Sequence, residues 1–143
     1  MAQRRNLKPS QPKPGKSALG IVHPTAGSGK ASTDEFVPWF SLEHVQPGYC
    51  VTDCQQQEKA ACLDKLRRLA RMTWTQIKLS DRQGMSFEII AASSMKVPIP
   101  AVIPRDGIRS TYFNGKNCRL VGFREGQVFH IVWIDRDLST YRH

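Results

Sequence analysis

The stretch CRLVGFREGQVFHIVWID, residues 118–135, decides the fold. Mostly apolar runs lie on both sides of Glu125-Gly126, as they do in the two buried strands of a hairpin. Gly126 supplies the positive φ that a tight hairpin turn needs. We therefore predict a β-hairpin with a two-residue turn at Glu125-Gly126, in which Arg124 faces Gln127.

This register sorts the hairpin side chains onto two faces of a sheet, because facing residues share a side. The apolar face suits helix packing and comprises Cys118, Leu120, Phe129, Ile131 and Trp133. The second face comprises Arg119, Val121, Phe123, His130, Val132 and, by the same alternation, Arg136. An arginine in an apolar strand is costly to bury unpaired. Arg119 should therefore meet an acid such as Asp135 or Asp137, or line a cleft open to an anion.

The residues before the hairpin predict an α+β fold. A strand is expected within FVPWFSLEHV, residues 36–45, and a helix over residues 52–72, where Thr52 and Gln55 fit a capping box. A second helix over 73–79 and strands over 85–91 and 110–113 follow, separated by a loop over 93–107 whose three prolines forbid a central strand. The predicted architecture is a helical hairpin packed on a small antiparallel sheet, in the order strand, two helices, three or four strands.

The first 36 residues differ in composition from the rest. They are rich in Pro, Gly, Ser and Lys, and they hold six of the 21 Lys and Arg residues. Such a segment buries too little apolar surface to offset its ordering entropy, so we predict a flexible basic arm over 1–36 and one domain over 37–143. The stretch PTAGSGKAS, residues 24–32, lacks the first glycine and the final Ser or Thr of a phosphate-binding loop.

The whole chain is basic, with 143 residues, a net charge of +9 and a pI near 9.8. A polyanionic partner is therefore expected. No apolar run is long enough to cross a membrane, and the first residues do not form a signal peptide, so we expect a cytoplasmic protein without a membrane partner. The four cysteines then serve as small apolar residues. His44, Cys50 and Cys54 offer a zinc alternative, but their spacing matches no paired knuckle, so neither a metal nor another cofactor is predicted.

The ending CRLVGFREGQVFHIVWIDRDLSTYRH, after a strand and paired helices, resembles the RelE and ParE superfamily of bacterial toxins. That family has a helical hairpin on a small antiparallel sheet, and its ribosome-dependent members cut messenger RNA. By position, Arg119 and Arg136 match two family arginines, Tyr141 matches the terminal tyrosine, and Lys116 matches an upstream lysine. The resemblance implies an endoribonuclease of a toxin-antitoxin system that acts on ribosome-bound mRNA and is inhibited by an acidic antitoxin protein.

The residue types fit this chemistry. Guanidinium groups stabilise the charge that develops on a phosphate, a role we assign to Arg119 and Arg136. Proton transfer would fall to His130, His143 or Tyr141. Tyr141 could instead stack on a base, and a tyrosine that packs on the edge of the sheet fits the sequence equally well. RNA contacts are expected from Lys116, Arg124, Arg67, Arg68 and Arg71.

Two alternatives stay open. The helix arginines also fit a solvated face. The whole basic surface also fits a non-catalytic module that binds nucleic acid or a nucleoprotein, including a ParE-like inhibitor.

Overall fold

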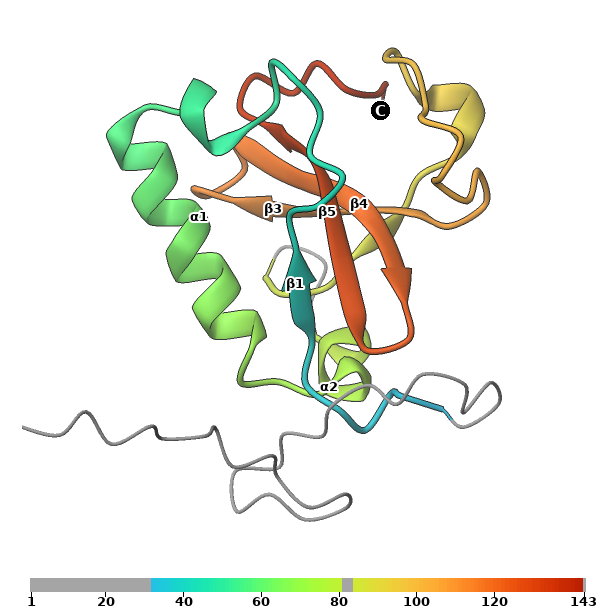
Figure 1. The fold of residues 1–143 in the computed structure, drawn as a ribbon. Coiled ribbons are helices and arrows are strands. Elements are labelled where there is room, and N and C mark those ends of the chain that lie inside the picture. Colours follow the sequence, from blue (N-terminus) through green and yellow to red (C-terminus); the bar gives the residue numbers. More distant parts are fainter. Residues whose placement is uncertain (1–31, 81–83, 143) are drawn as a thin grey trace, which may run out of the picture.

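The computed structural model describes residues 32–80 and 84–142, which form an α+β fold (Figure 1). Within these residues, two α-helices lie on one face of a five-stranded sheet. Most of the predicted arm, residues 1–31, lies outside the described residues, as does His143. The described chain begins against the domain, because the amides of Trp74 and Thr75 donate to the carbonyls of Phe36 and Asp34 at 3.0 and 2.9 Å.

The sheet has the strand order β1-β5-β4-β3-β2. Strands β2 (Glu88–Ile89), β3 (Ile108–Phe113), β4 (Cys118–Glu125) and β5 (Val128–Asp135) pair antiparallel, whereas β1 (Trp39–Ser41) runs parallel to β5. The sheet is therefore mixed, and the expectation of a purely antiparallel sheet was wrong. Along the chain, both helices and three strands lie between β1 and β5. No tight turn therefore fixes the direction of β1 relative to β5.

The β4–β5 turn lies one residue later than predicted. Glu125 pairs with Val128, so the turn residues are Gly126, with a φ of 59°, and Gln127. Gln127 is 0% exposed; its Nε2 donates to the carbonyl of Val37 at 2.8 Å, and its own carbonyl accepts from Trp74 Nε1 at 3.1 Å. These long-range bonds hold Gln127 in the turn, and the local pattern gave no sign of them.

A β-bulge at Val132 changes the faces of the hairpin beyond that point. Gly122 pairs with Ile131 and Val121 with Trp133, which leaves Val132 as the extra residue. Trp133 therefore packs on the second face and Ile134 on the helix face, the reverse of the prediction. Arg136 changes sides for the same reason.

Helix α1 (Gln56–Leu69) begins four residues later than predicted. Thr52 lies instead in a 3-10 turn, Val51–Asp53, and the helix starts where Glu58 Oε1 accepts from the amide of Gln55 at 2.7 Å. Helix α2 (Trp74–Leu79) follows, with Thr73 Oγ1 accepting from the amide of Gln76 at 3.1 Å. The short link between the helices lets both cover the same face.

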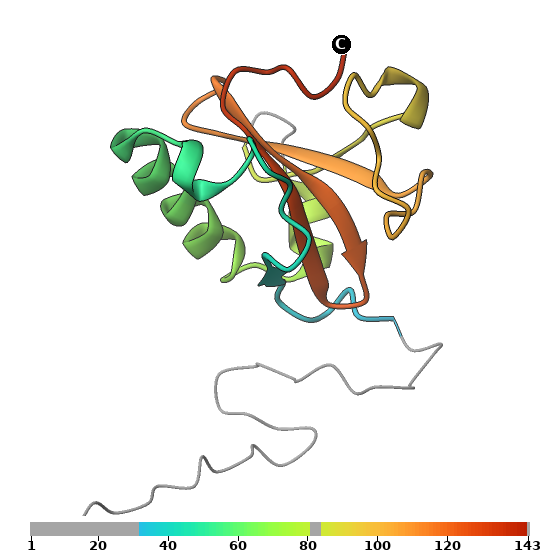
Figure 2. The same ribbon diagram turned by 45° about the horizontal axis from the view of Figure 1, so that its top comes forward.

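The sheet is buried on both faces (Figure 2). The helix-side core includes Leu69, Trp74, Leu120, Phe129, Ile131 and Ile134. On the second face, the core includes Ile90, Ile103, Ile108, Val121, Phe123, Val132, Trp133 and Tyr141. Part of this cover comes from the proline-rich segment 90–107, so the second face is not the open cleft that the sequence suggested.

Candidate functional site

Arg119 lies in a buried polar cluster at the end of β5. Its Nη2 lies 3.1 Å from Asp135 Oδ2, and both side chains are 0% exposed. Its guanidinium carbon lies 3.6 Å from the centre of the Tyr141 ring. Of the two roles that the sequence left open, Arg119 therefore has the first, because it meets the acid Asp135 instead of an open cleft.

Asp135 also binds the tail that follows it. It accepts hydrogen bonds from Thr140 Oγ1 at 2.6 Å and from the amides of Ser139 and Thr140 at 2.9 and 3.1 Å. Burial by itself raises the pKa of Asp135, but these hydrogen bonds and the charge of Arg119 hold the pKa below its ordinary value. The carboxylate is thus charged at neutral pH and holds the tail against the sheet.

Tyr141 is 3% exposed, and its hydroxyl donates to Ser110 Oγ at 2.9 Å. Burial raises the pKa of Tyr141 above its ordinary value, although the hydrogen bond with Ser110 acts in the opposite direction. At neutral pH the ring is therefore neutral and covered. In this conformation it reaches neither a splayed base nor a leaving group.

Arg136 lies on the other side of the sheet from Arg119. Its Nε lies 3.0 Å from Glu58 Oε1 on α1, and its side chain is 37% exposed. The two arginines that were expected to share a phosphate are therefore separated by the sheet. His143, another predicted catalytic residue, lies outside the described residues.

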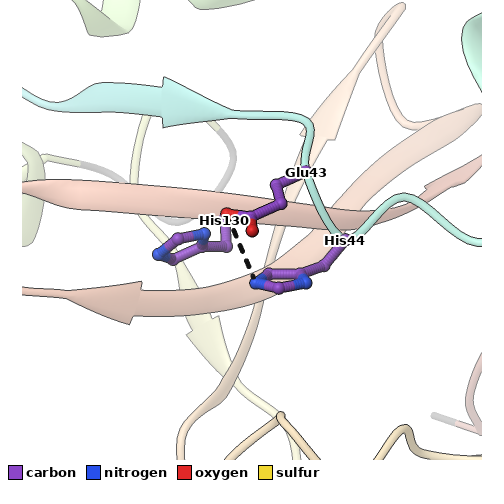
Figure 3. A group of neighbouring side chains, drawn as sticks. All are labelled: Glu43, His44 and His130. Carbon is purple, nitrogen blue, oxygen red and sulfur yellow. Dashed lines mark ion pairs between the residues drawn. The ribbon is translucent and has the colours of Figure 1, made fainter.

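His130 lies on the second face of the sheet beside two residues that follow β1, Glu43 and His44 (Figure 3). The centres of the two imidazole rings are 5.3 Å apart, and the His130 ring stacks on Phe123 at 4.6 Å. His130 is 9% exposed, and among residues 32–80 and 84–142 neither of its buried ring nitrogens has a hydrogen-bond partner. Its Nε2 lies 3.8 Å from Glu125 Oε1, beyond hydrogen-bond length.

In the sequence, His44 offered a zinc alternative only together with Cys50 and Cys54. In the structure, Cys54 Sγ instead donates to the carbonyl of Cys50 at 3.7 Å. Among the described residues, the one group of three or more His, Cys, Asp or Glu residues that fits a metal ion is Glu43, His44 and His130. No local signal joins them, because their contact depends on the pairing of β1 with β5.

The predicted RNA-binding residues are spread over the molecule. Arg67, Arg68 and Arg71 are exposed on the second half of α1 and just after it. Lys116 is exposed in the β3–β4 turn, at the opposite end of β4 from Arg124. Arg124 is largely covered, with its side chain 12% exposed, because it pairs with Asp34 at 2.7 Å and lies over Trp74.

The chain matches no family model, no curated protein and no solved structure. Among the described residues, no helix is long and apolar enough to cross a membrane. The function is therefore inferred from the residues and their geometry.

Proposed function

We propose that this protein binds RNA as a non-catalytic module, using the end of the domain where its basic N-terminal segment is attached. The observation that carries the proposal is the contact of Thr33 and Asp34 with β4 and α2: Arg124 Nη2 donates to Thr33 Oγ1 at 3.0 Å, and Asp34 pairs with Lys78 at 2.7 Å (Figure 1). We call this region the basic end and define it by Arg67, Arg68, Arg71, Lys78 and Arg124.

Acidic residues neutralise only part of the basic end. Asp64 pairs with Arg67 and Arg68 at 2.9 and 3.2 Å, and Asp34 pairs with Lys78 and Arg124, both at 2.7 Å. Three of the pairs join half-exposed side chains, and water screens such pairs strongly. A phosphate can therefore compete with Asp64 and Asp34 for Arg67, Arg68 and Lys78 at a small energetic cost.

The sequence of residues 1–31 adds to this charge. It contains six Lys or Arg residues and no Asp or Glu. Because the segment joins the domain at the basic end, its charges act together with those of α1 on one polyanion. A basic tether beside a basic surface raises both the affinity for RNA and its dependence on salt.

Binding accounts for the structure better than cleavage does. The cleavage mechanism assigned phosphate contacts to Arg119 and Arg136 and a terminal role to Tyr141. Arg119 is 0% exposed and Tyr141 is 3% exposed, so neither reaches a ligand unless the tail detaches. Exposed arginines on a helix face meet no such barrier.

The proposed relationship to the RelE and ParE superfamily rests on the order of elements and on the hairpin residues. A strand, two helices and then a run of antiparallel strands follow one another here. We propose that α1 and α2 correspond to the family's helical hairpin. An acidic antitoxin protein would then be a second partner, and it would compete with RNA for the basic end.

Salt-dependent binding tests the proposal. The full chain is titrated onto a fluorescent single-stranded RNA at several salt concentrations, beside the triple variant Arg67→Gln, Arg68→Gln and Arg71→Gln. The matched control removes the same charge elsewhere, through Lys96→Gln, Arg105→Gln and Arg142→Gln, all exposed residues. If three phosphate contacts are lost, the slope of log K against log salt should fall by about 2 in the first variant only.

An equal loss in both triple variants would mean that net charge alone drives binding, and the proposal would be wrong. A chain that begins at residue 32 should also bind more weakly and with a smaller slope.

Incubation with ribosomes and messenger RNA separates the two functions. Intact messages are expected. Cut messages, together with growth arrest on induced expression, would instead support the hypothesis of an RNA-cleaving toxin.

A further inference from the structure

Glu43, His44 and His130 come together where the chain leaves β1 and passes over β5 (Figure 3). One potential ligand atom from each side chain lies within 4.8 Å of the other two. Ser41 pairs with His130 in the parallel β1–β5 ladder, so the backbone fixes the distance between the two segments. The cluster is therefore built by the sheet itself.

His130 is the unusual member of this cluster. Its ring is 9% exposed and is held by stacking on Phe123, yet neither ring nitrogen has a hydrogen-bond partner in the part of the chain that the structure describes. A buried polar group without a partner destabilises the fold, because it has lost its hydrogen bonds to water. Native proteins rarely accept such a cost, and sites that bind an ion are one reason why they do.

We propose that Glu43, His44 and His130 bind one divalent transition-metal ion of the zinc class. Two imidazoles and a carboxylate are a ligand set that zinc accepts with a water molecule in the fourth position. Magnesium and calcium prefer ligand sets made only of oxygen, so the two histidines disfavour them. This inference does not depend on RNA binding, because none of the three residues belongs to the basic end.

The surroundings select the ligand nitrogen of His130. Its Nε2 lies 3.8 Å from Glu125 Oε1, which places a carboxylate where a metal-bound histidine usually donates its second N–H. Nδ1 is then the nitrogen that binds the ion. Glu125 is a positioning residue here, because it orients the imidazole without touching the metal.

The ligand atoms must approach one another when the ion binds. Tetrahedral bonds of about 2.0–2.2 Å place ligand atoms roughly 3.3 Å apart, which is closer than the 4.8 Å limit of the cluster. Glu43 can supply most of this movement, because its side chain is 73% exposed. The two imidazoles are more restricted, since the His44 and His130 side chains are only 22% and 11% exposed.

The test is a zinc titration of the metal-stripped full chain in competition with a coloured chelator. Cys50, the one thiol that is not buried, is changed to Ser beforehand, so that thiolates do not compete. One zinc ion per chain is expected. The variants Glu43→Gln and His44→Gln should each weaken binding by at least about tenfold, the smallest loss typical of a residue that only supports a ligand.

Two controls separate the site from general effects of charge or imidazole. Glu88→Gln removes an exposed carboxylate from β2, and His23→Gln removes an imidazole from the N-terminal segment, so both should bind zinc like the parent chain. Cobalt gives a second readout, because a nitrogen- and oxygen-bound ion shows visible bands without a thiolate-to-metal band. His130→Gln is informative if it folds, and Glu43→Gln, at an exposed position, keeps the test valid if it does not.

Three results would overturn the proposal. The first is a zinc affinity that is equal in the parent chain, in Glu43→Gln and in His44→Gln. The second is a cobalt spectrum with a thiolate-to-metal band. The third is no zinc binding at a micromolar zinc concentration. Each would leave the cluster as three neighbouring side chains that bind no ion.

Discussion

The guanidinium carbon of Arg119 lies 3.6 Å from the centre of the Tyr141 ring, and its Nη2 lies 3.1 Å from Asp135. This arrangement explains why an apolar strand ends in DRDLSTYRH. Asp135 neutralises the buried arginine and accepts hydrogen bonds from Ser139 and Thr140, while Tyr141 covers the guanidinium and donates to Ser110. Residues 135–141 therefore have a structural role, because they cover the second face of the sheet. We call these residues the latch.

Replacing Asp135 with Asn should destabilise the domain by about 3–5 kcal/mol, because Arg119 would keep its charge without a counterion. Chemical denaturation measures the change, and Asp137→Asn, at an exposed position, serves as the control with a change within about 0.5 kcal/mol. Because the pKa of Asp135 is lowered in the fold, its contribution is present above the unfolded value of about 3.9 and is lost as the pH falls through the folded value. Equal losses in the two variants would contradict the latch.

Deletion of residues 140–143 should destabilise the domain substantially. Thr140 is 0% exposed and Tyr141 is 3% exposed, and both bind the sheet through hydrogen bonds. The melting temperature should fall by several degrees, since a loss of 1 kcal/mol lowers it by about 2–8 °C in domains of this size range. A truncated chain with an unchanged melting temperature would show that the tail is dispensable.

Replacing Gly122 with Ala should cost about 3 kcal/mol or more, at or beyond the upper end of typical overpacking. A Cβ built on Gly122 would lie 1.8 Å from the carbonyl oxygen of His130, a backbone atom that cannot move without opening the β4–β5 ladder. Gly107→Ala is the matched control, because the nearest atom to its Cβ is Pro104 Cβ at 3.5 Å, an ordinary contact. Similar free energies of unfolding for the two variants would mean that the strands separate easily at the bulge.

Lys65 should make the stability rise with pH in the alkaline range. Its side chain is 2% exposed, and burial, with a smaller effect from the charge of Arg68, lowers its pKa to about 8. Between about pH 8 and the unfolded value of about 10.4, the unfolded chain binds more protons than the folded chain, so stability increases. Lys65→Met should be more stable than the parent at pH 7, and the difference should shrink toward pH 10. Parallel stability curves for parent and variant would contradict this origin.

Local patterns predicted much of the fold. The alternation around Gly126 gave the β4–β5 hairpin with its turn one residue off, and the helical spacing gave α1 and α2. Leu69, Leu120, Phe129 and Ile131 pack together as expected. The bulge at Val132 was not predictable, since an extra residue leaves no mark in the alternation. That one residue reversed the faces of Trp133 and Arg136.

The candidate sites were less predictable than the fold, because they depend on contacts between distant segments. Alternation placed His130 on the second face correctly, but the approach of His44 requires the parallel pairing of β1 with β5. Sequence also left open whether Arg119 meets an acid or an anion. Its partner Asp135 faces it directly in the observed register, which the later turn and the bulge produce together.

The pairing of β1 with β5 has a consequence for how the chain is made. Among the described residues, β1 emerges first from the ribosome and its partner emerges almost last, because Trp39 pairs with Val128. The β1–β5 ladder cannot form during most of synthesis. β1 therefore lacks its partner strand while both helices and three strands are synthesised. Pairings of such long sequence separation slow folding and leave strand edges open to wrong partners. Folding of this domain is therefore expected to finish only after β5 has left the ribosome.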